Sequence, residues 1–569
     1  MEALKKNKTK FILSFIIAIL VIICVYSLCT YKGNDKNTGF PKIGAGFKNH
    51  MTNSANSKNT PSSNSKKVTT NNIKKDSKTN SQNHSRADIG GPPDSQNSSG
   101  SKSTMQGPPG SQGNPNFKNN IKRSHGGPPG MMGGFSNSDN KYSPYVIAYA
   151  LAFFVLSILG YLAIVKKKIK ISTENSGFIL ASFLIIGFLF RIIVGLLITG
   201  YSSDIGLYKQ WASSAAKNFA SVYKSTGSID YPPVYIYVLF IIGKIASTSL
   251  GSYYTLLIKL PSIIADIASA YFVYKLSKKY FSFEKSFVLT LFFLFNPAIL
   301  INSALWGQAD SFFTLLIIFA VYFMSENKII PSSVFFALSV LMKPQGIIFL
   351  PLVLFWYIRN RDLKAILKSI ASGILTAIIV ILPFSIVNGN ITWIFKLYTR
   401  EVSEYPYASN NAYNLYNLIG ANNVKDSNTM FIFSYHTWGM IFIVLITVFS
   451  GILFLKSKSK RVATLAALIQ VVGVFNLSVG MHERYMFAAV LISILAYIYF
   501  KNNKILIISL LLSFINYANM HSVLFNQMSM RNNSSTPIWT VFISLLNIIT
   551  FAYLIKVSFD LCIKKNTTT

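Results

Sequence analysis

The sequence predicts an all-α polytopic integral membrane protein with about fourteen transmembrane helices. Of its 569 residues, 51% are hydrophobic and 14% are aromatic, whereas only 13% are charged. Long apolar runs recur along the chain, and about 20 apolar residues suffice to cross a hydrocarbon core of about 30 Å. Because backbone polar groups find no water inside lipid, these runs are expected to be helices.

The excess of positive charge indicates membrane orientation rather than a nucleic-acid partner. Lys and Arg number 54 against 19 Asp and Glu, which gives a net charge of +35. The lysines gather in short clusters between apolar runs, where they favour the cytoplasmic side. No aromatic-basic module accompanies them, so we expect no nucleic acid to bind. The three cysteines, Cys24, Cys29 and Cys562, lie in or beside apolar runs and have no spacing typical of a metal site or a disulfide.

The first predicted segment, residues 1–30, is an uncleaved N-terminal transmembrane anchor. Lysines precede its apolar run and no A-x-A cleavage site follows it, which places the N-terminus in the cytoplasm. Residues 31–143 are rich in Ser, Asn, Lys and Gly, so they bury too little apolar surface to fold and should form a disordered extracytoplasmic tether. A second helix within 144–170 returns to the cytoplasm, and a third at 177–199 leads out again.

The apolar run that follows Pro232 and Pro233 predicts an amphipathic helix lying in the outer interface. If this run crossed the bilayer, the lysine cluster at 275–285 would lie outside, against the positive-inside rule. Placing this run in the interface also places the later basic loops and the C-terminus in the cytoplasm. The remaining predicted crossings are 255–275, 286–303, 311–325, 330–343, 345–358, 365–387, 437–455, 462–480, 485–500, 504–520 and 538–557. A module then spans 177–500, and 501–569 holds the C-terminal helices.

With this topology the polar motifs face the outside, and the first of them contains Asp204. Tyr208 and Trp211 follow at distances of four and three residues, so all three share one side of a helix. A partly desolvated carboxylate beside two aromatic rings suits a general base next to a sugar. The alternative is a helix N-cap with two interfacial aromatic anchors.

Further polar motifs could hold an anion, although each also has a structural interpretation. Asp310 opens an apolar run, either at a functional cavity or as a helix cap. Lys343 lies at a proline-broken hairpin on the outer side, where a lipid phosphate or Asp310 could be its partner. The triplet His482-Glu483-Arg484 could bind phosphate through Arg484 and orient it through His482, or form a solvated loop. Its spacing does not fit a metal site.

Taken together, these motifs resemble a known family. In chain order they are Asp204 with Trp211, Asp230-Tyr231-Pro232-Pro233, Lys259-Leu260-Pro261 with Asp266, Asn296-Pro297, Gly307-Gln308-Ala309-Asp310, Lys343-Pro344-Gln345 and His482-Glu483-Arg484-Tyr485. This order is similar to that of the GT-C membrane glycosyltransferases. The nearest resemblance is to bacterial relatives of the GPI-anchor mannosyltransferases and of the glucosyltransferases that use dolichyl-phosphate glucose, and it covers about 177–500.

The resemblance implies an inverting transfer of a hexose from a polyprenyl-phosphate donor on the outer face, without a metal or other cofactor. It implies that Asp204 is the catalytic base. For the donor phosphate it implies Lys343 and Arg484, with His482 and Lys259 as helpers. The residues expected at the sugar or acceptor are Asp310, Gln308, Asp230, Tyr208, Trp211 and Glu483.

The sugar and the acceptor remain open at this stage. Mannose is favoured by the resemblance alone, and the acceptor could be a cell-envelope polymer, a glycolipid or an exported protein. The main rival function is a carrier or flippase for lipid-linked saccharides, which would favour ionisable groups at mid-membrane and internal repeats. Asp266 is the main acidic residue expected at mid-membrane, and the chain has no evident internal repeat. A third possibility is a non-catalytic scaffold that displays residues 31–143.

Overall fold

The computed structural model describes residues 2–31, 140–165, 175–227, 229–532 and 537–564. Almost all of the predicted tether at 31–143 therefore lies outside the described residues. The described chain is helical apart from turns, loops and four strands of two residues each. This confirms the all-α, polytopic class.

The elements of the first half include long apolar helices and short ones that place the polar turns. They are α1 (Glu2–Thr30), η3 (Asn140–Tyr142), α2 (Ser143–Val165), α3 (Ser176–Leu197), α4 (Ser202–Lys217), α5 (Val222–Ser225), α6 (Pro233–Ala246), η4 (Ser249–Tyr253), α7 (Tyr254–Ser277), α8 (Phe283–Leu294), α9 (Pro297–Leu300), the π-helix η5 (Ile301–Trp306) and α10 (Asp310–Ser325).

The second half continues the bundle and adds the strands. Its elements are α11 (Ile329–Val340), η6 (Pro344–Phe349), α12 (Pro351–Asn360), α13 (Leu363–Asn388), α14 (Trp393–Glu404), β1 (Ser409–Asn410), α15 (Leu415–Leu418), β2 (Thr429–Met430), β3 (Phe433–Ser434), α16 (Tyr435–Lys456), η7 (Lys460–Val462), α17 (Ala463–Leu477), β4 (Met481–His482), α18 (Ala488–Phe500), α19 (Asn503–Asn532), α20 (Ile538–Phe559) and η8 (Asp560–Lys564). Strand β1 pairs in parallel with β4, and β2 pairs antiparallel with β3.

Fewer helices than predicted are long enough for a full crossing. Within the described residues, ten are long and apolar enough to span a membrane. The other four predicted crossings correspond to α10, α11, α12 with its preceding η6, and α18. At about 1.5 Å per residue, the 12 residues of α11 extend about 18 Å, well short of a hydrocarbon core of about 30 Å. The predicted count of fourteen full crossings is thus not reproduced.

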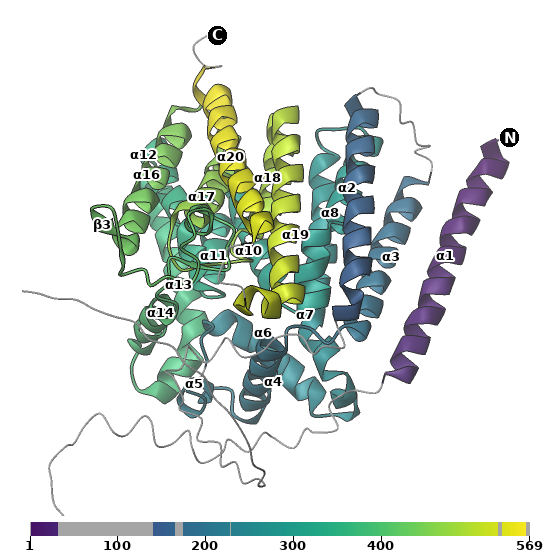
Figure 1. The fold of residues 1–569 in the computed structure, drawn as a ribbon, viewed down its shortest axis with the longest axis horizontal. Coiled ribbons are helices and arrows are strands. Elements are labelled where there is room, and N and C mark those ends of the chain that lie inside the picture. Colours follow the sequence, from purple (N-terminus) through teal and green to yellow (C-terminus); the bar gives the residue numbers. More distant parts are fainter. Residues whose placement is uncertain (1, 32–139, 166–174, 228, 533–536, 565–569) are drawn as a thin grey trace, which may run out of the picture. The chain divides into compact units, whose positions relative to one another are not determined.

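The structure confirms that α6 does not cross between α3 and α7. The Lys259 Nζ, in the second turn of α7, donates to the Ile198 carbonyl just after α3 at 2.5 Å. Helix α7 therefore begins at the end of the bundle where α3 ends. Between them α6 packs alongside α4 (Figure 1), so closely that a Cβ on Gly243 would lie 2.1 Å from the Ala212 carbonyl oxygen.

The basic loops meet at one end of the bundle. The Arg461 guanidinium lies 5.0 Å from the centre of the Tyr280 ring and 5.2 Å from that of Tyr499. The Lys501 ammonium lies 5.7 Å from the same Tyr280 ring. Tyr280 follows α7, Arg461 follows α16, and Tyr499 and Lys501 lie at the end of α18. The three loops that begin there were expected on one side of the membrane, and they do lie at the same end of the bundle.

Helices α17 and α18 form the enclosed part of the bundle. Helix α17 is buried from Ala463 through Asn476, and α18 from Ala488 through Tyr499. Helices that are apolar on all sides are expected in such an interior position. The turn between them carries the triplet His482-Glu483-Arg484 and is therefore held by the core.

A buried ion pair links the helices beneath that turn. The Arg191 Nε of α3 donates to the Asp266 Oδ2 of α7 at 2.9 Å, and the Ser303 hydroxyl of η5 donates to the same oxygen at 2.6 Å. Charged groups are tolerated inside a membrane protein when they pair with one another. Asp266 thus ties α3 and α7 to the π-helix.

Candidate active site

The turn between α3 and α4 brings Asp204 against the end of η5. The Tyr201 amide donates to the Trp306 carbonyl at 3.1 Å. Gly200 allows this approach, since its φ is +98° and a Cβ there would lie 2.8 Å from the Trp306 carbonyl oxygen. Asp204 follows in the first turn of α4, whose N-cap residue makes no side-chain capping hydrogen bond. The Asp204 carboxylate therefore lies close to the residues at the end of η5.

Two donors converge on one oxygen of Asp204. The Trp306 indole Nε1 donates to Oδ2 at 2.9 Å, and the Gln308 Nε2 donates to the same atom. Among the described residues, Oδ1 has no such donor, so it is the oxygen left to face a ligand. Two donors of this kind fix the carboxylate's orientation and stabilise its charge.

Gln308 holds this position because η5 ends in a tight turn. The Asn302 carbonyl accepts from the amides of both Gly307 and Gln308, at 3.1 and 3.0 Å. Gly307 has a φ of +86°, and a Cβ there would lie 2.6 Å from Ile205. The positive φ therefore favours glycine here, and a larger residue would also have to displace the tip of the Ile205 side chain. On its other side, the Gln308 Oε1 accepts from the Tyr208 hydroxyl at 2.9 Å.

Tyr208 and Trp211 do share a helix face, but that face is buried. Each is 2% exposed. The Tyr208 ring packs with those of Tyr231 and Tyr235, and the Trp211 ring packs with that of Tyr231, at centroid distances of 5.5 to 5.6 Å. Neither ring is open to a ligand as it stands, and the expected role of both as surfaces for a sugar ring stays a prediction. Tyr208 supports Gln308, and Trp211 packs behind it.

A second set of charges lies across the site on three other elements. The Lys343 Nζ donates to the Asp310 Oδ1, and both side chains are buried. The Asn302 Nδ2 donates to Oδ2 of the same aspartate at 2.9 Å. The Arg484 Nε lies 3.9 Å from that oxygen, and its NH1 donates to the Glu483 Oε1 at 2.7 Å. Asp310 is thus held between the two cations expected to bind phosphate.

The two groups are connected by side chains. The Lys343 ammonium lies 5.1 Å from the centre of the Tyr231 ring, and the Tyr231 and Tyr208 hydroxyls are 2.8 Å apart. Tyr208 in turn donates to Gln308, which donates to Asp204. Arg484 also lies 5.8 Å from the centre of the Trp306 ring. Asp204, Lys343 and Arg484 therefore belong to one local network.

Burial sets the charge state of the triplet. It lowers the pKa of His482 well below its usual value, and the positive charges of Arg484 and Lys343 lower it further, so the imidazole is neutral. Burial also raises the pKa of Glu483, although Arg484 opposes this. For Arg484 burial lowers the pKa, but the carboxylates of Glu483, Asp204 and Asp310 outweigh it and raise the pKa well above its usual value. The guanidinium therefore stays charged.

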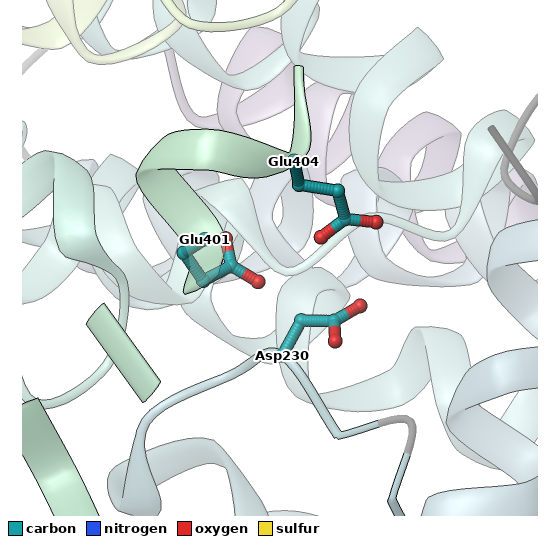
Figure 2. A group of neighbouring side chains, drawn as sticks. All are labelled: Asp230, Glu401 and Glu404. Carbon is teal, nitrogen blue, oxygen red and sulfur yellow. The ribbon is translucent and has the colours of Figure 1, made fainter. Parts of the chain in front are cut away.

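Asp230 lies in a separate cluster of three carboxylates. Figure 2 shows its side chain and those of Glu401 and Glu404 pointing toward one another, with oxygens within 4.8 Å. Burial, followed by the charge of Glu404, raises the pKa of Asp230 to about 7. Burial, followed by the charge of Asp230, raises that of Glu401 to about 8. Three such oxygens could bind a divalent cation, but the Arg400 NH2 already bonds the Asp230 Oδ1 at 3.2 Å.

Lys259, the further predicted phosphate helper, has its ammonium at the end of α3. Its side chain is fully buried, and Nζ donates to the carbonyls of Gly195 and Ile198 at 3.2 and 2.5 Å. A cation at the carbonyl end of a helix is favourable. Lys259 thus fixes the end of α3, and its role as a phosphate helper stays a prediction.

Sequence reasoning missed several residues of the site. Trp306 and Tyr231 stand within the motifs that were singled out but were given no role there, and Asn302 was not singled out, because neither composition nor spacing indicates the partners of these residues. Glu401 and Glu404 are three residues apart on α14, a spacing that places them on one helix face. That spacing was the available signal for the acidic cluster.

Comparisons with known proteins match parts of the chain. Residues 212–406 match the family described as GPI transamidase subunit PIG-U. A stretch of 146 residues, 26% of the chain, is 28% identical to GPI mannosyltransferase 1 of Kluyveromyces lactis and covers 34% of it. The chain thus spans about a third of the length of this relative. The matches confirm the resemblance to membrane proteins related to the GPI-anchor mannosyltransferases, although the family match includes neither Asp204 nor His482.

Proposed function

We propose that this protein is an inverting glycosyltransferase that moves a hexose from a polyprenyl-phosphate donor to an acceptor on the outer face of the membrane. The observation that carries this proposal is the network joining Asp204 to Lys343 and Arg484. A carboxylate held by two donors and two cations nearby are the groups that such a transfer requires.

Asp204 acts as the general base. Its Oδ1 takes the proton of the acceptor hydroxyl while Trp306 and Gln308 hold Oδ2. The acceptor oxygen attacks the anomeric carbon on the face opposite the phosphate. The bond from that carbon to the phosphate oxygen breaks, the phosphate leaves with the electron pair, and the configuration is inverted.

Lys343 and Arg484 stabilise the leaving phosphate. Cations placed where charge develops lower the barrier most effectively in a site that excludes water. Arg484 carries five N–H donors, of which one bonds Glu483, so it can serve a phosphate as well. The His482 Nε2 is buried and has no hydrogen-bond partner among the described residues, which makes it a further contact for a phosphate oxygen.

The donor and the side of the membrane are inferred from chemistry and charge. Mannose is the favoured hexose, because the matched relative is named a mannosyltransferase. The outer face follows from the lysine-rich loops at the opposite end of the bundle. A cell-envelope polymer, glycolipid or protein is the acceptor class that can be reached there, and the N- and C-termini are cytoplasmic.

A lipid-linked saccharide carrier without transferase chemistry is the second candidate. The matched family is described as a transamidase subunit and not as a transferase, and the matched residues start after Asp204, so the match gives no support to the proposed base. A carrier would translocate the lipid-linked sugar without joining it to an acceptor.

Membranes containing the protein would be supplied with polyprenyl-phosphate mannose, glucose or galactose and with envelope acceptors. We expect transfer from one donor, and a loss of about 10²- to 10⁴-fold in Asp204→Asn, the range that a general base contributes. Asp362→Asn is the matched control, because Asp362 caps α13 and asparagine caps a helix equally well. Translocation of the donor without transfer by the parent protein would favour the carrier.

A further inference from the structure

The hairpin formed by β2 and β3 exposes two large apolar side chains. Thr429 pairs with Ser434 and Met430 with Phe433, which leaves Phe431 and Ile432 as the two-residue turn. The Phe431 side chain is 89% exposed and that of Ile432 is 79% exposed. No charged residue lies between Thr429 and Ser434. The tip of the hairpin is therefore apolar throughout.

The residue at the first position of this turn is unfavourable for its backbone conformation. Phe431 has a φ of +60°, a conformation that two-residue turns usually fill with glycine or asparagine. Bulky residues rarely adopt it. A phenylalanine at this position points to a use for its side chain.

The hairpin is fixed to the first turns of α16. The Trp438 indole Nε1 donates to the Met430 carbonyl at 2.9 Å, and the Trp438 ring lies 5.4 Å from that of Phe433. Phe442, one turn further along α16, stacks on Trp438 at 5.9 Å. Strand β3 accordingly lies beside α16 (Figure 1).

Helix α16, against which the hairpin packs, carries an exposed apolar face. Met440, Val444, Val448 and Ile452 are all exposed and stand four residues apart, so they form one apolar face. Helix α16 is apolar and long enough to cross a membrane, and lipid is the medium that such a face meets. Trp438 stands at its start, where aromatic residues favour the membrane interface.

The base of the hairpin is polar and suits the aqueous side of that interface. The Asp426 Oδ2 lies 3.0 Å from the His436 Nδ1, and Lys425 and Ser427 beside them are exposed. Charged residues thus stand at the base and apolar ones at the tip, which is the division expected of an element that enters a bilayer edge.

We propose that the β2–β3 hairpin is a membrane anchor whose tip, Phe431 and Ile432, inserts into the lipid next to α16. The partner is the bilayer itself. This inference does not depend on the transferase chemistry.

The anchor also helps to position residues 405–410, which lie beside the triplet His482-Glu483-Arg484. The Asp426 amide donates to the Pro406 carbonyl at 3.0 Å, and Tyr405 packs edge-on against His482 at 4.5 Å. Fixing the hairpin in lipid therefore fixes the height of residues 405–410 beside the triplet.

The test uses single cysteines in the full chain. Cys24, Cys29 and Cys562 are replaced by serine, and either Phe431→Cys or Ser427→Cys is labelled with the fluorophore NBD. Each protein is placed in nanodiscs of phosphatidylcholine and phosphatidylglycerol. Emission is then quenched with doxyl-labelled phosphatidylcholine or with aqueous iodide. Ser427 is the matched control, because it is exposed at the polar base of the same hairpin.

The proposal expects the label at position 431 to lose most of its emission to doxyl lipid and little to iodide, with the reverse at position 427. Quenching of both labels by iodide alone would overturn it. Protection of position 431 from both quenchers would also overturn it, because the tip would then be covered by protein.

Discussion

Gln308 donates to Asp204 with its amide nitrogen and accepts from Tyr208 with its amide oxygen. One side chain thus orients the proposed base and connects it to the buried tyrosines. A carboxamide supplies an N–H donor and a carbonyl acceptor on one planar group, and these two contacts use one of each.

Gln308→Glu should therefore reduce transfer strongly. The change replaces a donor to the Asp204 Oδ2 with a second carboxylate, and the loss of a hydrogen bond to a charged group costs about 1.5 to 3 kcal/mol. We expect a fall of about 10- to 100-fold in kcat, measured in the membrane transfer assay. Gln210→Glu, on the exposed side of α4, is the control and should keep the parental rate.

Lys343 should matter both for stability and for transfer, and the two effects can be separated. Lys343→Met leaves Asp310 buried without its main cation, which typically costs about 3 to 5 kcal/mol. Lys343→Met with Asp310→Asn removes both charges and should recover most of the thermal stability in detergent. The double variant should still transfer poorly, because the phosphate has lost one of its two cations. Recovery of transfer along with stability would show that Lys343 is only structural.

The acidic cluster predicts looser packing of α14 at high pH. Asp230 and Glu401 have pKa values raised from 3.8 and 4.5 to about 7 and about 8, so folding favours their protonated forms. Their contribution to stability is full below about pH 4 and is lost as the pH rises through 7 and 8. The positive charge of Arg400 lowers the pKa of both carboxyl groups, so it reduces this loss of stability.

Hydrogen exchange of the α14 amides, corrected for the intrinsic pH dependence, measures this effect. Protection should decline between about pH 5 and 8, and Glu401→Gln should flatten the decline. An identical profile in parent and variant would contradict the assignment. Addition of calcium or magnesium at pH 8 would also reveal whether the cluster binds a cation.

The ion pair between Arg191 and Asp266 should be structural. Asp266→Ala leaves the Arg191 guanidinium buried and uncompensated, with an expected cost of about 3 to 5 kcal/mol. Asp362→Ala at the start of α13 removes only a helix cap and should cost about 1 kcal/mol. Thermal unfolding in detergent compares the two. Equal stability of both variants would mean that water reaches the pair.

Charge and apolar length were sufficient to predict the class and to predict that α6 adds no crossing between α3 and α7. The predicted segments 311–325, 330–343 and 345–358 do correspond to α10, α11 and η6 with α12. Each was counted as a full crossing, although none of these helices alone is long enough for one. The Pro344 break was visible, but its result, a 3-10 segment before α12, depends on packing against α11 and α17.

The site was also predictable only in part, because local spacing does not show how the helices pack. The spacing of Tyr208 and Trp211 correctly indicates a shared face, but only the packing of α6 against α4 shows that the face is buried. Likewise the side chain of Lys259 has the right chemistry for a phosphate, yet the fold directs it to the end of α3. The joining of Asp230 with Glu401 requires contact between residues 171 positions apart, which no local pattern encodes.

Donor binding and single-turnover transfer, measured together on Asp204→Asn, test the central claim most directly. The proposed base acts on the acceptor and not on the donor phosphate. We therefore predict that the variant binds polyprenyl-phosphate mannose within a few-fold of the parent affinity but transfers it at least about 10²-fold more slowly. Transfer at the parental rate, or a parallel loss of donor binding and transfer, would contradict the assignment of Asp204 as the catalytic base.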